Sequence, residues 1–240
     1  IAVRSSSLLE DSHYQPFAGV YSTYMVPQIP DDDRLMLELL SNAIKSVYAS
    51  VFFHDSKAYM AATSNLIDEE KMAIVLQQVA GTQYNDRFYP SFSGVARSIN
   101  FYPIAPEKPE DGIASIALGL GKYIVDGGIS LRFSPKYPKK ILQLSTPDMA
   151  LRETQKHFYA LDLNPGSFYT SVDDGINLKK LKLEEASENS AFRSMVSTYD
   201  FNSQMLQEGI LMDGKRVATF SSILNHNSFP LAEILNTCLE

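Results

Sequence analysis

The 240-residue chain is acidic, with a net charge of -7, and 45% of its residues are hydrophobic, which is enough to build a core. The acidic balance without a basic run argues against a nucleic-acid surface. The sequence contains no run of about 18 apolar residues, so we expect no membrane span. The one cysteine, Cys238, excludes an internal disulfide framework and is typical of a reducing cytoplasm. We therefore expect a cytoplasmic chain of one large domain or two lobes that binds neither nucleic acid nor a membrane.

The first elements of the chain combine an apolar strand with a polar turn. The strand is predicted to deliver Arg4 and the three serines that follow it into this turn. A short segment, 17–24, comes next and contains Gly19 and Thr23. Arginine can hold two phosphate oxygens at once, and hydroxyls and glycine-loop amides can donate to others. By pattern alone, the same residues also suit a solvated turn with a surface arginine.

A helix is predicted to begin at the acidic triplet 31–33, which follows a proline. The carboxylates lie at the positive end of the helix dipole, and we favour this role over a metal site. Apolar residues then recur at three- and four-residue spacing: Met36, Leu40, Ala43, Ile44, Val47 and Val51. A second helical piece covers 52–62 and contains His54, for which we expect a surface or partly packed position.

The middle of the chain alternates strands with loops. The near-continuous apolar run 71–80 predicts a buried strand that ends in two glutamines. Residues 81–92 are interpreted as a polar, aromatic turn region, and 92–96 as another strand. The proline-rich, acidic segment 103–111 predicts an exposed loop.

The C-terminal half has weaker patterns, in which a G-L-G motif at Gly119 to Gly121 allows tight backbone geometry. The Asp213-Gly214 pair predicts the turn of a hairpin within 210–217. The other predicted elements are a strand at 157–162, a strand or short helix at 178–183, a strand at 217–224 and a helix at 229–240.

The beginning of the chain resembles the pyruvate phosphate dikinase and phosphoenolpyruvate synthase family. Its nucleotide-binding domain carries V-R-S-S-[AS]-x-x-E-D, a spacer, and F-A-G-Q-x-x-T-Y. The matching residues are Val3, Arg4, Ser5, Ser6, Glu10, Asp11, Phe17, Ala18, Gly19, Thr23 and Tyr24. The run 71–80 is similar to the family strand M-A-V-V-V-Q-[KR]-M-V, and the G-L-G segment also resembles the family. From Ser134 onward the resemblance thins.

The resemblance implies an α+β fold, namely a two-lobed, ATP-grasp-like nucleotide-binding domain. Residues 1–66 would belong to the first lobe and 67–240 to the second. In the ATP site, Arg4 and Ser5 would hold phosphate, with Arg4 also acting in catalysis. The family pattern implies further contacts from Ala18 and Gly19 over the phosphates, from the Thr23 hydroxyl, and from Gln77, Gln78 and Val79 to the adenine edge.

The family transfers the β-phosphoryl group of ATP, with magnesium, to a histidine on a swivelling domain. That phosphohistidine then phosphorylates pyruvate on a barrel domain, so both domains would be partners of this one. The chain departs from the family at Val20, Ile99 and Lys122, which replace a glutamine, an arginine and a glutamate. Two alternatives therefore stay open: another dikinase-type phosphotransferase, and a degenerate domain that binds nucleotide for regulation without transfer.

The resemblance also implies that the domain is incomplete at both ends. The family's G-G-K-G loop would precede Ile1, and the strand with the magnesium ligands would follow Glu240. We therefore assign no metal ligand within the chain. None of its four histidines matches the family's acceptor motif: His13, His54, His157 and His226. We expect the chain alone to be catalytically silent.

Overall fold

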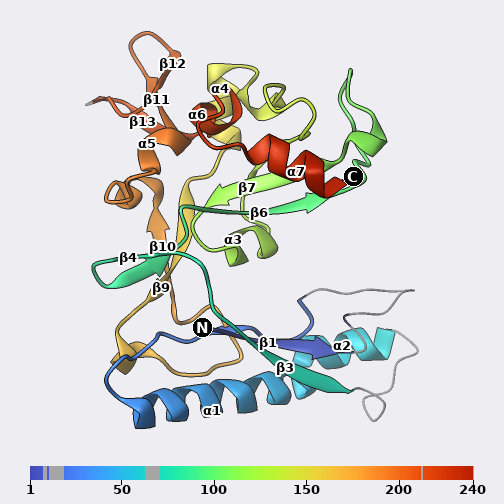
Figure 1. Cartoon of the computed structure of the whole chain (residues 1–240), viewed down its shortest axis with the longest axis vertical. Helices are drawn as coiled ribbons and strands as arrows, with labels where there is room; N and C mark the ends of the chain where they lie inside the picture. Colours follow the sequence, from blue (N-terminus) through green and yellow to red (C-terminus); the bar gives the residue numbers. More distant parts are fainter. Residues whose placement is uncertain (8–9, 11–18, 63–70, 212, 240) are drawn as a thin grey trace. The chain divides into compact units, whose positions relative to one another are not determined.

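The computed structural model describes residues 1–240 except 8–9, 11–18, 63–70, 212 and 240. It combines helices with antiparallel strands, which confirms the predicted α+β class (Figure 1). The ATP-grasp assignment itself stays a prediction. The chain forms two compact units, unit 1 (Ile1–Phe88 and Leu161–Lys179) and unit 2 (Tyr89–Ala160 and Lys180–Glu240). The predicted lobe boundary at 66/67 lies outside the described residues and also stays a prediction.

Unit 1 contains a three-stranded antiparallel sheet in the order β2-β1-β3, formed by Tyr24–Met25, Ala2–Ser7 and Met72–Gln77. The predicted polar turn at Ser5 to Ser7 is wrong. All three serines belong to β1, because their backbones pair with Ile74, Ala73 and Met72 of β3. The strand therefore carries Arg4 and the serines alternately on the two faces of the sheet.

Helix α1 (Asp33–Ala49) covers one face of this sheet (Figure 1) and confirms the predicted helix. Its N-cap Asp32 accepts a hydrogen bond from the Leu35 amide at 2.9 Å, as expected of a helix start with acidic residues. Leu39, Ala43 and Val47 of α1 are buried against Val3 and Tyr24. The chain continues through a 3-10 turn, η1 (Ser50–Phe52), into α2 (His54–Ala62), which confirms the second helical piece.

The stretch Asp33–Ala61 has the length and mean hydropathy of a candidate membrane span, by those two criteria alone. Extended backbone at Phe53 separates α1 from α2 within it. Moreover, α1 buries its apolar stripe against the sheet, as a helix that covers a protein core does. The absence of membrane contact stays a prediction from the sequence.

Strand β3 confirms the predicted strand, but its predicted burial is wrong. Met72 and Ile74 are half-buried, whereas Val75 and Leu76 are 38% and 53% exposed. The reason is that α1 covers only one face of the sheet, and that β3 has one neighbour, β1, among the described residues. Apolar composition therefore did not imply burial on both faces.

Residues 81–92, predicted as a turn region, contain a hairpin of β4 (Thr82–Tyr84) and β5 (Arg87–Tyr89). It belongs to a sheet in the order β10-β9-β5-β4, with β9 at His157–Asp162 and β10 at Leu178–Lys182. Strand β9 was predicted, and β10 resolves the open choice at 178–183 in favour of a strand. The chain crosses between the two units within β5, β9 and β10.

Unit 2 contains a sheet in the order β6-β7-β8, formed by Phe92–Arg97, Ile113–Leu118 and Leu131–Phe133. Strand β6 was predicted. The loop before β7 ends in a short 3-10 turn, η3 (Pro109–Asp111). The other short helices of this part are α3 (Lys122–Val125), η4 (Leu142–Leu144) and α4 (Pro147–Glu153).

The second sheet of unit 2 has the order β12-β11-β13, formed by Met205–Glu208, Val196–Asp200 and Lys215–Ala218. The hairpin predicted at Asp213-Gly214 is wrong, because β12 and β13 both pair with β11. The strand predicted at 217–224 ends at Ala218. The remaining short helices of unit 2 are η6 (Leu183–Ala186), α5 (Phe192–Met195), α6 (Ser221–Leu224) and α7 (Leu231–Leu239), the last of which confirms the predicted C-terminal helix. In unit 1, the segment 163–177 contains the 3-10 turn η5 (Pro165–Ser167).

Candidate functional site

The face of the β2-β1-β3 sheet that points away from α1 carries two of the predicted site residues, Arg4 and Gln77. Side chains alternate between the two faces of a strand, and directly paired residues share a face. Val3 and Ile74 pack in the α1 core, so their neighbours along the strands lie on the opposite side. We call this side the open face. Its members on β1 and β3 are Ala2, Arg4, Ser6, Ala73, Val75 and Gln77.

Arg4 is exposed on the open face, and Thr23 directly precedes the neighbouring strand β2. Ile1 and Val26 exchange two backbone hydrogen bonds of 2.8 Å, and Val3 pairs with Tyr24. Continued by one residue, this register sets Arg4 against Thr23 in a non-hydrogen-bonded pair. The Cα atoms of such a pair are about 4.5 Å apart and their side chains share a face. From this continuation we expect Arg4 and Thr23, which belong to separate motifs, to be neighbours.

Gln77 joins this pair from the other side of β1. Arg4 is directly opposite Val75, and Gln77 is opposite Ala2. Gln77 is therefore a diagonal neighbour of Arg4, at about 7–8 Å between Cα atoms. Between them Val75, 38% exposed, gives the face an apolar floor. The open face combines one cation, hydroxyls, an amide and an apolar patch.

Ser5 lies on the other face of β1. It is only 3% exposed, on the side covered by α1, whereas Ser6 is partly exposed on the same face as Arg4. The family pattern did not reveal this difference, because both serines match it. Strand alternation is the signal that separates them.

The segment before Thr23 is described only from Gly19 onward, so Ala18 lies outside the described residues. Gly19 has φ +87°, and no atom of the described residues lies within 4 Å of a Cβ built there. Val20, at the family's glutamine position, is 8% exposed and packs with Tyr21, Val51 and Met60. This departure from the family is therefore a core residue.

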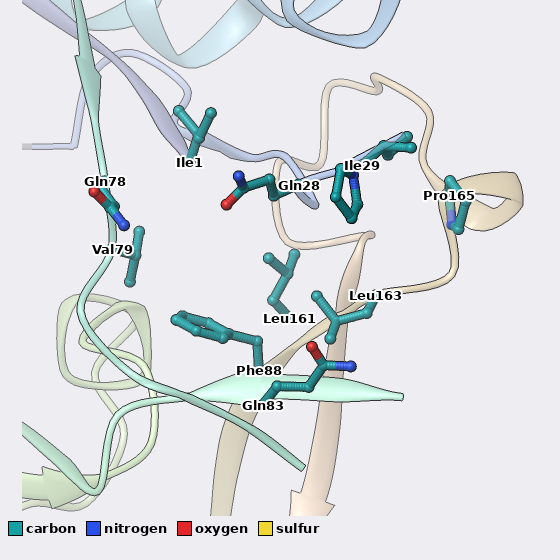
Figure 2. A pocket seen from close by; sticks show the side chains of 11 residues that line it. Ile1, Gln28, Ile29, Gln78, Val79, Gln83, Phe88, Leu161, Leu163 and Pro165 are labelled. Atoms are coloured by element: carbon teal, nitrogen blue, oxygen red, sulfur yellow. The ribbon is translucent and has the colours of Figure 1, made fainter. Parts of the chain in front are cut away.

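Gln78 and Val79 line a pocket in unit 1 of about 570 Å³ (Figure 2). Gln78 follows directly after the Ala2–Gln77 pair, so the same register sets it beside Ile1. The hairpin β4–β5 contributes Gln83 and Phe88, which sequence reasoning had treated as a turn. The lining residues are apolar apart from three carboxamides: Ile1, Gln28, Ile29, Pro30, Gln78, Val79, Gln83, Phe88, Leu161, Leu163 and Pro165.

The segment 163–177 of unit 1 is hydrogen-bonded to Thr23 and Tyr24 of the second family motif. The Thr23 amide donates a hydrogen bond to Asp174 Oδ2 at 2.8 Å, and the Tyr24 hydroxyl donates to the Ser171 carbonyl. Burial raises the pKa of Tyr24, and the charges of Asp174 and Asp173 raise it further, while a hydrogen bond with Ser22 opposes the shift. The neutral, donating form of this hydroxyl is thereby favoured.

The G-L-G segment of unit 2 has a structural explanation. Gly119 has φ +86°, and a Cβ there would lie 2.8 Å from the Tyr159 carbonyl oxygen and 2.9 Å from the Phe158 ring. Its own carbonyl accepts a 2.6 Å hydrogen bond from Ser93 Oγ. Lys122, which replaces the family glutamate, pairs with Asp126 at 3.0 Å.

No three His, Cys, Asp or Glu side chains converge on one point within the described ranges. The described residues thus do not by themselves make up a magnesium site.

A family model described as "Pyruvate phosphate dikinase, AMP/ATP-binding domain" matches residues 1–165. The match extends past Ser134, where we expected the resemblance to thin. An uncharacterized phosphotransferase, YvkC, of Bacillus subtilis is 31% identical over 130 residues, 54% of this chain and 14% of that protein. A phosphoenolpyruvate synthase of Aeropyrum pernix is 30% identical over 188 residues, 76% of this chain and 20% of that protein. The chain thus corresponds to a fifth or less of these relatives, and it belongs to the family of pyruvate phosphate dikinase AMP/ATP-binding domains.

Proposed function

We propose that unit 1 binds ATP on its open face, with the phosphates at Arg4 and Thr23. The base would lie toward Gln77 and the start of the pocket at Gln78 and Val79. The observation that carries this proposal is the register of β1. It sets Gln77 diagonally beside Arg4 on one face and, continued one residue past Tyr24, brings Thr23 to the other side of Arg4.

The chemistry of the face supports the assignment. The Arg4 guanidinium can grip two phosphate oxygens, and the Thr23 and Ser6 hydroxyls can donate to others. Ser6 takes the place of Ser5 in this proposal, because Ser5 lies on the side covered by α1. The uncharged pocket lining suits a neutral base, whose edge a carboxamide or backbone amide can pair with.

In the whole protein, we propose that the β-phosphoryl group of ATP passes to a histidine on another domain, and from it to pyruvate. The α–β bond of ATP breaks as the histidine gains the β-phosphoryl group, which leaves AMP. The β–γ bond also breaks, and the γ-phosphoryl group passes to water and leaves as inorganic phosphate. A swivelling and a barrel domain are the expected partners in the cytoplasm. Catalysis of this kind consists of positioning and charge neutralisation, to which Arg4 would contribute directly. Magnesium would neutralise phosphate charge, with ligands from outside this chain.

A regulatory, non-transferring nucleotide site is the second candidate. Two observations favour it: Val20 is a core residue where the family has a glutamine, and Lys122 is paired with Asp126 where the family has a glutamate. Both candidates require ATP binding. They differ in whether AMP forms when the whole protein is incubated with β-labelled ATP, magnesium and pyruvate.

The binding proposal is tested by calorimetric titration of the chain with ATP. Arg4→Ala should weaken ATP binding about ten- to hundredfold, the value of a hydrogen-bonded charge, and Arg4→Lys should restore it only in part. The matched control is Arg34→Ala, which removes another exposed arginine, on α1. Equal affinities in Arg4→Ala and the unmodified chain would refute the phosphate site.

A further inference from the structure

The loop 168–177 lies beyond the part of the chain that matches the family, and it is built into unit 1. The buried side chain of Asn177 donates to the Tyr169 carbonyl at 2.8 Å and accepts from the Tyr169 amide at 3.1 Å. Phe168 packs against the α1 core. The loop is therefore held at both of its ends.

The middle of this loop places the Asp174 carboxylate against Thr23 of the second family motif. Asp174 Oδ2 accepts from the Thr23 amide at 2.8 Å. In a non-hydrogen-bonded pair, the backbone groups point away from the partner strand. Continuation of the β1–β2 register past Tyr24 would thus direct the Thr23 amide away from β1, toward Asp174, and would set the Thr23 side chain beside Arg4.

We propose that the Thr23 amide is a phosphate-oxygen site, which the Asp174 carboxylate fills in the absence of ligand. Carboxylate and phosphate oxygens both take charge-assisted hydrogen bonds from backbone amides. A phosphate that binds at Thr23 must replace Asp174, and it also meets the repulsion of that charge. The loop thus acts as an internal competitor of the phosphate. This inference rests on the proposed placement of phosphate at Arg4 and Thr23.

Pyrophosphate, ATP and adenosine are the three probes for the test, in calorimetric titrations without magnesium. Asp174→Asn keeps the side-chain shape and removes the charge, and Asp174→Ala removes the acceptor as well. The matched control is Asp173→Asn, since this neighbouring carboxylate accepts from the Gly175 amide at 2.9 Å within its own loop. Circular dichroism checks that each variant is folded.

Both Asp174 variants should bind pyrophosphate and ATP about tenfold more tightly than the unmodified chain, and Asp173→Asn should change little. Adenosine should bind all four proteins equally, because it carries no phosphate. An equal gain in Asp173→Asn would reduce the effect to general charge and overturn the inference. So would unchanged or weaker binding in the Asp174 variants, or no pyrophosphate binding by any of them.

The outcomes separate this inference from the proposed function. Tighter pyrophosphate binding by the Asp174 variants without any ATP or adenosine preference would support the anion site and remove the nucleotide proposal. ATP binding that depends on Arg4 but is the same in the Asp174 variants would support the nucleotide proposal and overturn the inference about Asp174. The titration with ATP is then repeated with magnesium. If Asp174→Asn weakens ATP binding under these conditions, the Asp174 carboxylate is a cation ligand and not a competitor, and the inference is overturned.

Discussion

The open face of unit 1 and the G-L-G segment of unit 2 both match the same family, but the fold uses them differently. Gly119 is required where it stands, because β9 leaves no room for a side chain. Arg4 has no such structural need, since it is exposed on a sheet face that α1 does not cover. A motif residue that the fold explains says little about ligands. A charged motif residue that the fold does not explain is the better candidate for function.

The apolar residues of the two regions show the same contrast. Leu118, at the end of β7, is fully buried, and its backbone amide and carbonyl are both bonded by the Gln155 carboxamide at 2.8 and 2.9 Å. Val75, in the middle of β3, remains 38% exposed beside Arg4. In the G-L-G region, the backbone groups of Leu118 thus have hydrogen-bond partners within the protein. The open face leaves the apolar Val75 and the charged Arg4 side by side and exposed, which is consistent with the nucleotide site that we propose.

The largest expected effect is on the stability of unit 2. Gly119→Ala should lower the free energy of unfolding by about 3 kcal/mol, from left-handed backbone strain and close packing together. Gly127→Ala is the matched control, because Gly127 has φ +77° but no atom within 4 Å of a built Cβ. Urea titration should show a smaller loss for this variant, of about 1–2 kcal/mol. Similar losses in both would contradict the structural explanation of the motif.

Val75→Asp should weaken ATP binding about tenfold, because it adds a negative charge on the open face next to Arg4. The side chain is partly exposed on an edge strand, so the free energy of unfolding should change little. Val125→Asp, at a 67% exposed position of α3, serves as the control in the same titration. If both substitutions had the same effect on affinity, the open face would not be the binding surface.

The two serines provide a smaller and sharper contrast. Ser6→Ala should weaken ATP binding about threefold, since it removes one hydroxyl from the face that carries Arg4. Ser5→Ala should leave affinity unchanged, because Ser5 is buried on the opposite face. Titration of both variants with ATP compares them directly. The reverse order of effects would mean that the register of β1 differs from the one described.

The smallest expected effect is an acid sensitivity confined to unit 2. Lys136 Nζ donates to Asp111 Oδ1 at 2.6 Å and the Lys108 amide to Oδ2 at 2.8 Å, so the pKa of Asp111 lies below its ordinary value. A lowered folded-state pKa means that the ionised group stabilises the fold above about pH 4, and that this contribution is lost as pH falls through the folded-state pKa.

Asp111→Asn should therefore reduce the slope of unfolding free energy against pH below about pH 4, as measured by urea titration at several pH values. Lys136→Met, which removes the partner charge, should reduce the same slope. ATP affinity at neutral pH should stay unchanged in both. A slope identical to that of the unmodified chain would exclude Asp111 as an acid-sensitive group.

Local sequence patterns predicted the elements whose contacts are local. The three- and four-residue spacing predicted α1, and the alternation at 157–162 predicted β9. The Asp213-Gly214 turn signal failed, because β12 and β13 pair with a third strand that comes before both in the chain. Such a choice depends on non-local pairing, which a four-residue turn pattern does not contain.

By itself, the sequence determined the α+β class, the family and the residues worth testing, because these follow from residue types and short spacings. Only the tertiary structure decided which of them share a face. The strands β1, β2 and β3 are separated along the chain. Their register sets Gln77 near Arg4, turns Ser5 toward α1 and, continued past Tyr24, brings Thr23 beside Arg4. A shift of one residue would exchange the two faces, so the position of each side chain depends on pairing across the sheet.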